Sequence, residues 1–227
     1  KLYSWGASQA GRLANGGPVN KYYSSPTQVP GTTWASTCKS DTYSMMATKT
    51  DGSAWFWGGS GPTTYARSIA GWPYNNYCSS PVLIPGTWTA NPNRVDQQKM
   101  IFTEKQGYAI DASGNLYSWG DNQYGCLGLN QPSPTMIAKT QVGTDSTWQW
   151  VTGYHHNSTS NTAAVKTDGT LWMVGGGGGP NGCLGLGPDK TERSSPTQIG
   201  TLTHWTSVTG GECGSYGGGF AACDNSG

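Results

Sequence analysis

The chain has 227 residues, a formal net charge of +1 and only 11% charged residues. Proteins that bind nucleic acid through its phosphates normally carry a basic face, so this scattered charge argues against general nucleic-acid binding. No run of 18 apolar residues is present, so no membrane-spanning helix is predicted. The chain begins with Lys1 and has no signal peptide, so we expect a processed product or an excised segment.

One sequence phrase occurs in four copies, each with an apolar strand, a Gly-containing turn and an aromatic strand. This order is typical of a β-hairpin. Three copies are intact, at residues 46–58, 108–120 and 163–175, and the fourth is divided between AACDNSG at the C-terminal end and KLYSWG at the N-terminal end. Four repeats therefore account for residues 1–227 as a single domain. Their turns are marked by Gly52, Gly114, Gly169 and Gly227.

The other landmarks follow in the same order in every repeat. The aromatic strand leads into a Gly-rich loop, then a proline-containing short strand, then a strand led by Trp, then the Ala-containing strand of the next hairpin. Four short strands at a period of 52–62 residues predict β-propeller blades. No window has sustained helical periodicity, so we expect an all-β propeller with little helix.

The divided hairpin predicts that two distant strands pair and complete one blade shared by the chain ends. An unpaired edge strand is adhesive, which favours a partner for each end, either within the molecule or between neighbouring molecules. The predicted closing strand pair consists of Leu2, Tyr3, Ser4 and Trp5 on one side and Phe220, Ala221, Ala222 and Cys223 on the other.

Six cysteines without a C-x-x-C pair favour an oxidising compartment over a metal site. Cys213 and Cys223 flank GSYGGGFAA and are a candidate disulfide across a hairpin. Cys126 and Cys183 occupy equivalent slots in neighbouring repeats, too far apart for a bridge, and are expected to be buried thiols. Asn157 begins an Asn-Ser-Thr acceptor for N-glycosylation.

The second repeat lacks the usual Gly-Leu-Gly loop and carries aromatic residues instead. Trp72, Tyr74 and Tyr77 are a candidate recognition loop for a glycan or a protein, and the alternative is that they pack between blades.

The residues that could bind a metal, bind a nucleotide or act in catalysis have simpler structural explanations. His155 and His156 lack a nearby third ligand, so no metal site is predicted. The Gly-rich segment 177–182 is followed by no helix that would bind a phosphate, so no nucleotide cofactor is expected. Acidic residues stand at hairpin turns, where Asp is favoured for backbone reasons: Asp51, Asp111, Asp168 and Asp224. We therefore predict no catalytic, cofactor-binding or metal-binding residue.

The segment NLYSWGDNQYGCLGLN from Asn115 resembles the regulator of chromosome condensation repeat nearly letter for letter. KLYSWGASQAGRLANG from Lys1 and TLWMVGGGGGPNGCLGLG from Thr170 are similar to it with small departures. The resemblance implies a β-propeller. Family members usually have seven blades, one of them shared by the two termini, whereas four repeats form either a four-bladed ring or part of a larger assembly.

We hypothesise a non-enzymatic binding or structural module, extracellular or on a virus particle, whose partner is a protein, a glycan or a copy of itself. Low charge, abundant aromatics and six cysteines favour this interpretation. The alternatives are an exchange-factor-like or ubiquitin-ligase adaptor domain, a lectin or carbohydrate-active enzyme, and a building block of a filament or capsid joined by strand exchange. A fold alone does not decide among these functions.

Overall fold

The computed structural model describes residues 1–38, 44–59, 78–88, 99–103, 105–156, 159–175, 184–189, 191–212 and 218–225. Within these ranges the chain is built from β-strands, with one short 3-10 segment, η1 (Gln9–Gly11). The predicted all-β class is confirmed.

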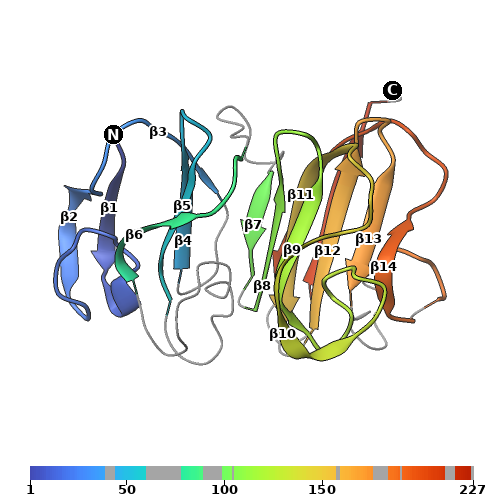
Figure 1. Ribbon diagram of the computed structural model, residues 1–227, viewed down its shortest axis with the longest axis horizontal. Coiled ribbons are helices and arrows are strands. Elements are labelled where there is room, and N and C mark those ends of the chain that lie inside the picture. The colour runs from blue at the N-terminus through green and yellow to red at the C-terminus, as the bar shows by residue number, and fades with distance from the viewer. Residues whose placement is uncertain are drawn as a thin grey trace.

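Three antiparallel four-stranded sheets form complete blades (Figure 1). Blade 1 contains β3 (Trp34–Cys38), β4 (Ser44–Lys49), β5 (Ala54–Gly58) and β6 (Cys78–Ile84). Blade 2 contains β7 (Met100–Phe102), β8 (Gln106–Ile110), β9 (Leu116–Asn122) and β10 (Ser133–Gln141). Blade 3 contains β11 (Trp148–His156), β12 (Thr159–Lys166), β13 (Leu171–Gly175) and β14 (Arg193–Gln198). Neighbours in each blade follow one another in the chain, as the repeat predicts.

Two two-stranded sheets flank the complete blades. The N-terminal half-blade pairs β1 (Tyr3–Ala7) with β2 (Tyr22–Gln28), and the C-terminal half-blade pairs β15 (Trp205–Glu212) with β16 (Gly218–Asp224). By repeat position, β15 and β16 correspond to the first two strands of a blade, and β1 and β2 to the last two. Figure 1 shows the N- and C-termini toward opposite ends of the longest axis.

The predicted hairpin turns lie at the turn glycines. Gly52, Gly114 and Gly169 have φ values of +80°, +85° and +76°, a region that disfavours residues with a Cβ. In the first turn, the Asp51 carboxylate accepts hydrogen bonds from the N–H and hydroxyl of Ser53 at 2.9 and 2.6 Å. This turn geometry confirms the three intact hairpins, while Gly227 lies outside the described residues.

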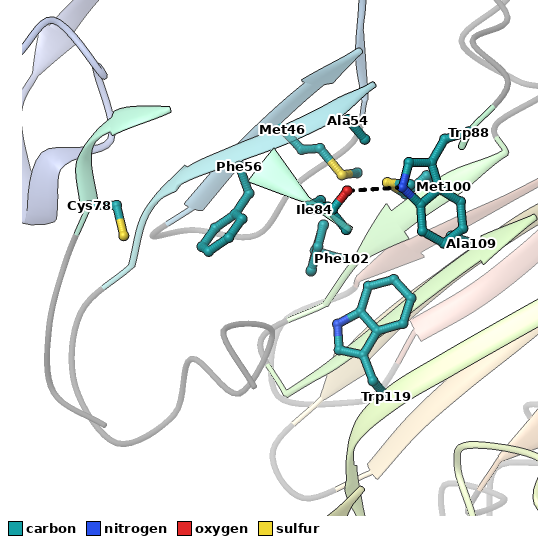
Figure 2. Packing of buried hydrophobic residues seen from close by; sticks show 10 residues of the cluster. All are labelled: Met46, Ala54, Phe56, Cys78, Ile84, Trp88, Met100, Phe102, Ala109 and Trp119. Carbon is teal, nitrogen blue, oxygen red and sulfur yellow. Dashed lines mark hydrogen bonds between the residues drawn. The ribbon is translucent and has the colours of Figure 1, made fainter. Parts of the chain in front are cut away.

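The hydrophobic core lies between successive blades. Between blades 1 and 2, the rings of Phe56 and Phe102 lie 6.4 Å apart, and Trp88 Nε1 donates to the Ile84 carbonyl at 3.3 Å (Figure 2). A second cluster joins blades 2 and 3 around Tyr108, whose hydroxyl donates to the Cys126 carbonyl. Further clusters attach the half-blades, so each blade is held by the apolar face of its neighbour.

An aromatic stack with a lysine recurs on the complete blades. In blade 3, Trp148 and Trp172 meet edge-to-face at 6.1 Å, and Lys166 Nζ lies 4.7 and 3.9 Å from their ring centroids. Lys166 also forms an ion pair with Asp145. Blades 1 and 2 repeat this arrangement with the amines of Lys49 and Lys139. The Trp-led strand and the aromatic strand are therefore tied together within a blade by cation–π contact.

Candidate binding surface at the open blade edges

The open edge of β1 exposes side chains that complete blades bury. Among the described strands, β1 pairs only with β2, whereas its equivalents β5, β9 and β13 each pair on both sides. Trp5 is 61% exposed, while Trp57 and Trp119 at the same repeat position are 2% and 0% exposed. Tyr3 is 46% exposed. The edge of the N-terminal half-blade is thus an apolar surface.

The outer edge of β16 is open in the complementary way. Within the described part of the chain, β16 pairs only with β15. Cys223 is exposed, whereas its equivalents Ile110 and Val165 in the complete blades are fully buried, and Ala222 is half-buried, whereas its equivalents Ala109 and Ala164 are buried. In an antiparallel ladder alternate N–H groups point to opposite neighbours. Ile110 N donates to Lys99 O, away from β9. Because Cys223 has the repeat position of Ile110, its N–H points to β15, and the N–H of the preceding Ala222 points to the open edge.

Both half-blades already have the backbone geometry of complete blades. Leu2 O accepts from Val29 N at 3.0 Å, as Leu116 O and Leu171 O accept from the corresponding strands at 2.8 Å. On the other side, Trp205 N donates to Gly169 O at 3.1 Å, as Trp148 N donates to Gly114 O at 3.1 Å. The half-blades therefore have the backbone hydrogen bonds of complete blades without a further strand.

Gly6 has the backbone conformation of Gly120 but lacks the neighbouring strand that Gly120 contacts. Its φ of +107° matches the +108° of Gly120 in β9. A Cβ on Gly120 would lie 2.2 Å from the Lys105 carbonyl oxygen, whereas a Cβ on Gly6 would meet nothing within 4 Å. The chain at Gly6 is shaped for close approach of a neighbouring strand. Gly6 was not among the predicted site residues, although a glycine ends the aromatic strand in all four repeats.

The predicted closing strand pair does not form within one chain. Among the described strands, β1 pairs with β2 and β16 pairs with β15, and Figure 1 shows the N- and C-termini apart, toward opposite ends of the longest axis. The physical reason is the packing between blades, which attaches one half-blade to blade 1 and the other to blade 3. This corrects the expected intramolecular pairing of Leu2, Tyr3, Ser4 and Trp5 with Phe220, Ala221, Ala222 and Cys223.

Cys223 carries a free, exposed thiol and lies opposite Ser207 in the register of β15 and β16. Cys213, its candidate disulfide partner, lies outside the described residues, so that disulfide stays a prediction. Cys126 is buried, as expected. Also outside the described residues are Cys183, the glycosylation acceptor Asn157 and the candidate recognition loop with Trp72, Tyr74 and Tyr77.

The described turn acids serve the backbone. The Asp168 carboxylate accepts from the hydroxyl and N–H of Thr170 at 2.7 and 3.0 Å, and these bonds lower its pKa. Burial acts to raise the pKa of Asp111, but hydrogen bonds from Asn115 and Ser113 outweigh it and lower the pKa. In the described ranges no three His, Cys, Asp or Glu side chains gather as a metal site. No helix described here is long and apolar enough to cross a membrane.

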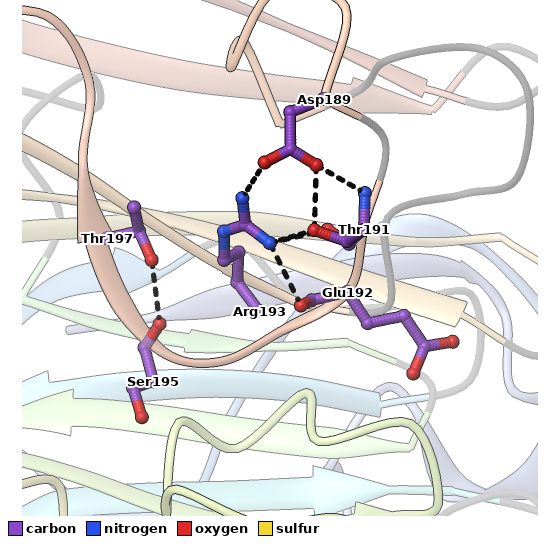
Figure 3. Close-up of polar contacts among 6 residues, drawn as sticks. All are labelled: Asp189, Thr191, Glu192, Arg193, Ser195 and Thr197. Atoms are coloured by element: carbon purple, nitrogen blue, oxygen red, sulfur yellow. Dashed lines mark hydrogen bonds and ion pairs between the residues drawn. The ribbon is translucent and has the colours of Figure 1, made fainter.

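A second polar group lies in the loop before β14 (Figure 3). Asp189 accepts from the N–H and hydroxyl of Thr191 at 3.0 and 2.7 Å and pairs with Arg193. The Thr191 N–H, its hydroxyl and then the guanidinium lower the pKa of Asp189 to about 2. This carboxylate orders its own loop, so it adds no separate site.

Comparisons with known proteins support the fold and part of the sequence signature. Residues 113–148 match the Regulator of chromosome condensation (RCC1) repeat. The predicted resemblance is confirmed. The Ultraviolet-B receptor UVR8 of Arabidopsis thaliana is 27% identical over 215 residues, covering 92% of this chain and 42% of its own length.

Solved structures with this fold extend over the whole chain. Human WBSCR16 gives a TM-score of 0.67 at 18% identity, covering 99% of this chain and 53% of that one. Prp20p of Saccharomyces cerevisiae, described with its binding to Gsp1p and histones, gives 0.65 at 16%, covering 99% and 52%. Yeast RCC1 (Prp20) with Kap60 bound gives 0.67 at 17%, covering 99% and 50%. The chain therefore spans about half the length of these relatives and has their β-propeller fold.

Proposed function

We propose that the chain is a non-enzymatic, protein-binding β-propeller module that binds an extended strand of its partner along an open blade edge. The observation that carries this proposal is the exposure of Trp5, whose equivalents Trp57, Trp119 and Val174 are buried in the complete blades. Strand addition supplies main-chain hydrogen bonds for affinity and side-chain pockets for specificity. An edge of this kind is adhesive unless a partner covers it.

The relatives support the class of function. Prp20p is described with its binding to Gsp1p and histones and is also found with Kap60 bound, so this fold is used to bind proteins. Those partners belong to chains about twice as long, and the individual partner is not carried over. The hydrogen-bonded state of Asp51 and Asp168 supports a non-enzymatic role, because their carboxylates are engaged by their own turns.

The extracellular or virion setting is also part of the proposal, supported by the low charge and the six cysteines. Counting thiols in the denatured chain tests it, since six free thiols would contradict an oxidising compartment. A glycan partner is the second candidate, because Tyr22 is 87% exposed on the N-terminal half-blade and aromatic faces stack on sugars. A glycan array compares wild type with Tyr22→Ala to test that candidate.

The deciding experiment measures binding of a labelled peptide with the sequence of residues 1–7, KLYSWGA, by fluorescence polarisation. Nanomolar chain concentrations keep the open edges accessible. We expect saturable binding to wild type and its loss in Ala222→Pro, because proline removes the N–H donor at the open edge. A peptide with Tyr3→Pro is the matched ligand control. Equal polarisation with both peptides would contradict the proposed function, and a nucleotide-release assay on small GTPases tests the exchange-factor alternative.

A further inference from the structure

We propose that Asn15 is a site of intramolecular deamidation, and that a hydrogen bond between the N-terminal half-blade and blade 1 restrains the reaction. Asn15 lies in the loop between β1 and β2 and is followed by Gly16, which has no Cβ to hinder attack on the Asn15 side chain. Gly16 is exposed to solvent. This modification goes beyond the proposed function and does not depend on it.

The reaction needs only the chain itself and water. The backbone nitrogen of Gly16 loses its proton and forms a bond to Cγ of Asn15, and the side-chain nitrogen of Asn15 leaves as ammonia. The product is a cyclic imide, a succinimide. Water then opens the ring at either carbonyl and leaves aspartate or isoaspartate at position 15. In isoaspartate the main chain runs through the side-chain carbonyl and is longer by a methylene group.

Two features of the Asn15 side chain favour the attack. Gly17 N donates to Asn15 Oδ1 at 3.0 Å, which draws electron density from Cγ and stabilises the negative charge that develops on Oδ1. Asn15 Nδ2 is buried and has no hydrogen-bond partner among the described residues. Its departure as ammonia therefore breaks no hydrogen bond in this part of the chain.

The attacking nitrogen is held by blade 1. Gly16 N donates to the Ser79 carbonyl of β6 at 3.0 Å, and we call this contact the loop hydrogen bond. The equivalent loop of blade 2 makes the same contact with blade 3, from Asn130 N to Ser194 O at 2.7 Å. A hydrogen bond donated by an N–H favours the protonated form of that group. The loop hydrogen bond therefore opposes the proton loss on which the attack depends.

Conversion should in turn break the loop hydrogen bond. The new carboxylate places a charge where the neutral, buried Nδ2 of Asn15 lay. An ionised carboxylate is far more costly to bury than a neutral amide, so the loop moves toward solvent. In isoaspartate the longer main chain also displaces Gly16 N from Ser79 O. Because the ammonia is lost, the change is permanent and records how long the loop has been detached from blade 1.

Peptide mapping by mass spectrometry tests the restraint. The folded chain and a synthetic peptide of residues 11–19, GRLANGGPV, are incubated in parallel at mildly alkaline pH, and aspartate and isoaspartate at position 15 are followed with time. We expect the folded chain to convert about tenfold or more slowly than the peptide, because only the locally opened fraction reacts. Equal rates would overturn the proposal that the fold restrains Asn15.

Gly11→Ala should open the loop, because its Cβ would lie 2.8 Å from the Cys78 carbonyl oxygen of β6. We expect conversion at Asn15 to become about fivefold or more faster. Gly125→Ala is the matched control, since its Cβ would lie 2.6 Å from Ser194 Cβ and disturb the equivalent contact between blades 2 and 3. It should leave the rate at Asn15 unchanged. No acceleration by Gly11→Ala, or equal acceleration by both variants, contradicts a restraint at this loop.

Two substitutions of Asn15 test the consequence without changing Gly11. Asn15→Asp imitates the product. Asn15→Leu has the side chain of Leu129, which stands at this repeat position in blade 2, so it should keep the loop hydrogen bond and form no succinimide. Hydrogen exchange of the Gly16 amide should be about fivefold or more faster in Asn15→Asp than in Asn15→Leu. Equal protection in the two variants would overturn the proposal that deamidation releases the loop from blade 1.

Discussion

Trp119 of β9 is completely buried, whereas Trp5, at the same repeat position in β1, exposes 61% of its surface. Trp119 packs edge-to-face on Phe102 from β7 in its own blade. The difference lies in the neighbours, because β9 has a strand on each side and β1 has one. Identical residues in identical local sequence therefore have different energetic roles.

Trp119→Ala should destabilise the chain by about 3–5 kcal/mol, because it leaves a large cavity between blades 1 and 2. The matched variant Trp5→Ala should change the unfolding free energy by less than about 0.5 kcal/mol in the dilute chain, because its side chain is largely solvated. Chemical denaturation of both variants at low concentration measures the difference. Equal losses would contradict the interpretation that β1 has an open edge.

Gly120→Ala should destabilise the fold by about 2 kcal/mol or more, since its Cβ would lie 2.2 Å from the Lys105 carbonyl and the backbone has a positive φ. Gly143→Ala shares the positive φ without the contact and should cost less. Thermal unfolding compares the two. Similar melting temperatures would show that conformational strain, rather than close strand approach, selects glycine at position 120.

Lys166→Met should destabilise blade 3 by about 1–2 kcal/mol, because it removes the charge lying over Trp148 and Trp172 while keeping the side-chain stem. A double-mutant cycle with Trp172→Leu isolates the cation–π contribution from the ion pair with Asp145. A coupling energy near zero would mean that the stack contributes packing alone.

Stability should fall as the pH is lowered from about 4 toward 2. Hydrogen bonds from Lys166 and Thr147 lower the pKa of Asp145, and those from Thr170 lower the pKa of Asp168, from the usual 3.8. A carboxyl group with a lowered folded-state pKa stabilises the fold above its unfolded pKa, and this contribution is lost as pH falls through the folded value. Thermal unfolding from pH 2 to 6 measures the slope. Asp145→Asn should flatten it, and an unchanged slope would contradict this role.

Much of the architecture was predictable because the determinants are local and repeated. The turn glycines Gly52, Gly114 and Gly169 and the aspartates beside them specify hairpins through backbone conformation and short-range hydrogen bonds. Burial of Ala47, Ala109 and Ala164 follows from their place in the second strand of each blade. The partner of Cys223 in the sheet could not be predicted from the sequence, because it depends on the register of β15 with β16, which places Cys223 opposite Ser207.

The sequence by itself determined the four repeats, the strand order within a blade and the complementarity of the two divided halves. Only the tertiary structure decided that β1 and β16 do not pair with each other within the described part of the chain. Repeat spacing specifies what each blade contains, whereas the angle between blades depends on how large side chains such as Trp119, Phe102 and Tyr108 pack between sheets. That packing is a long-range property, so it determines whether the ends meet.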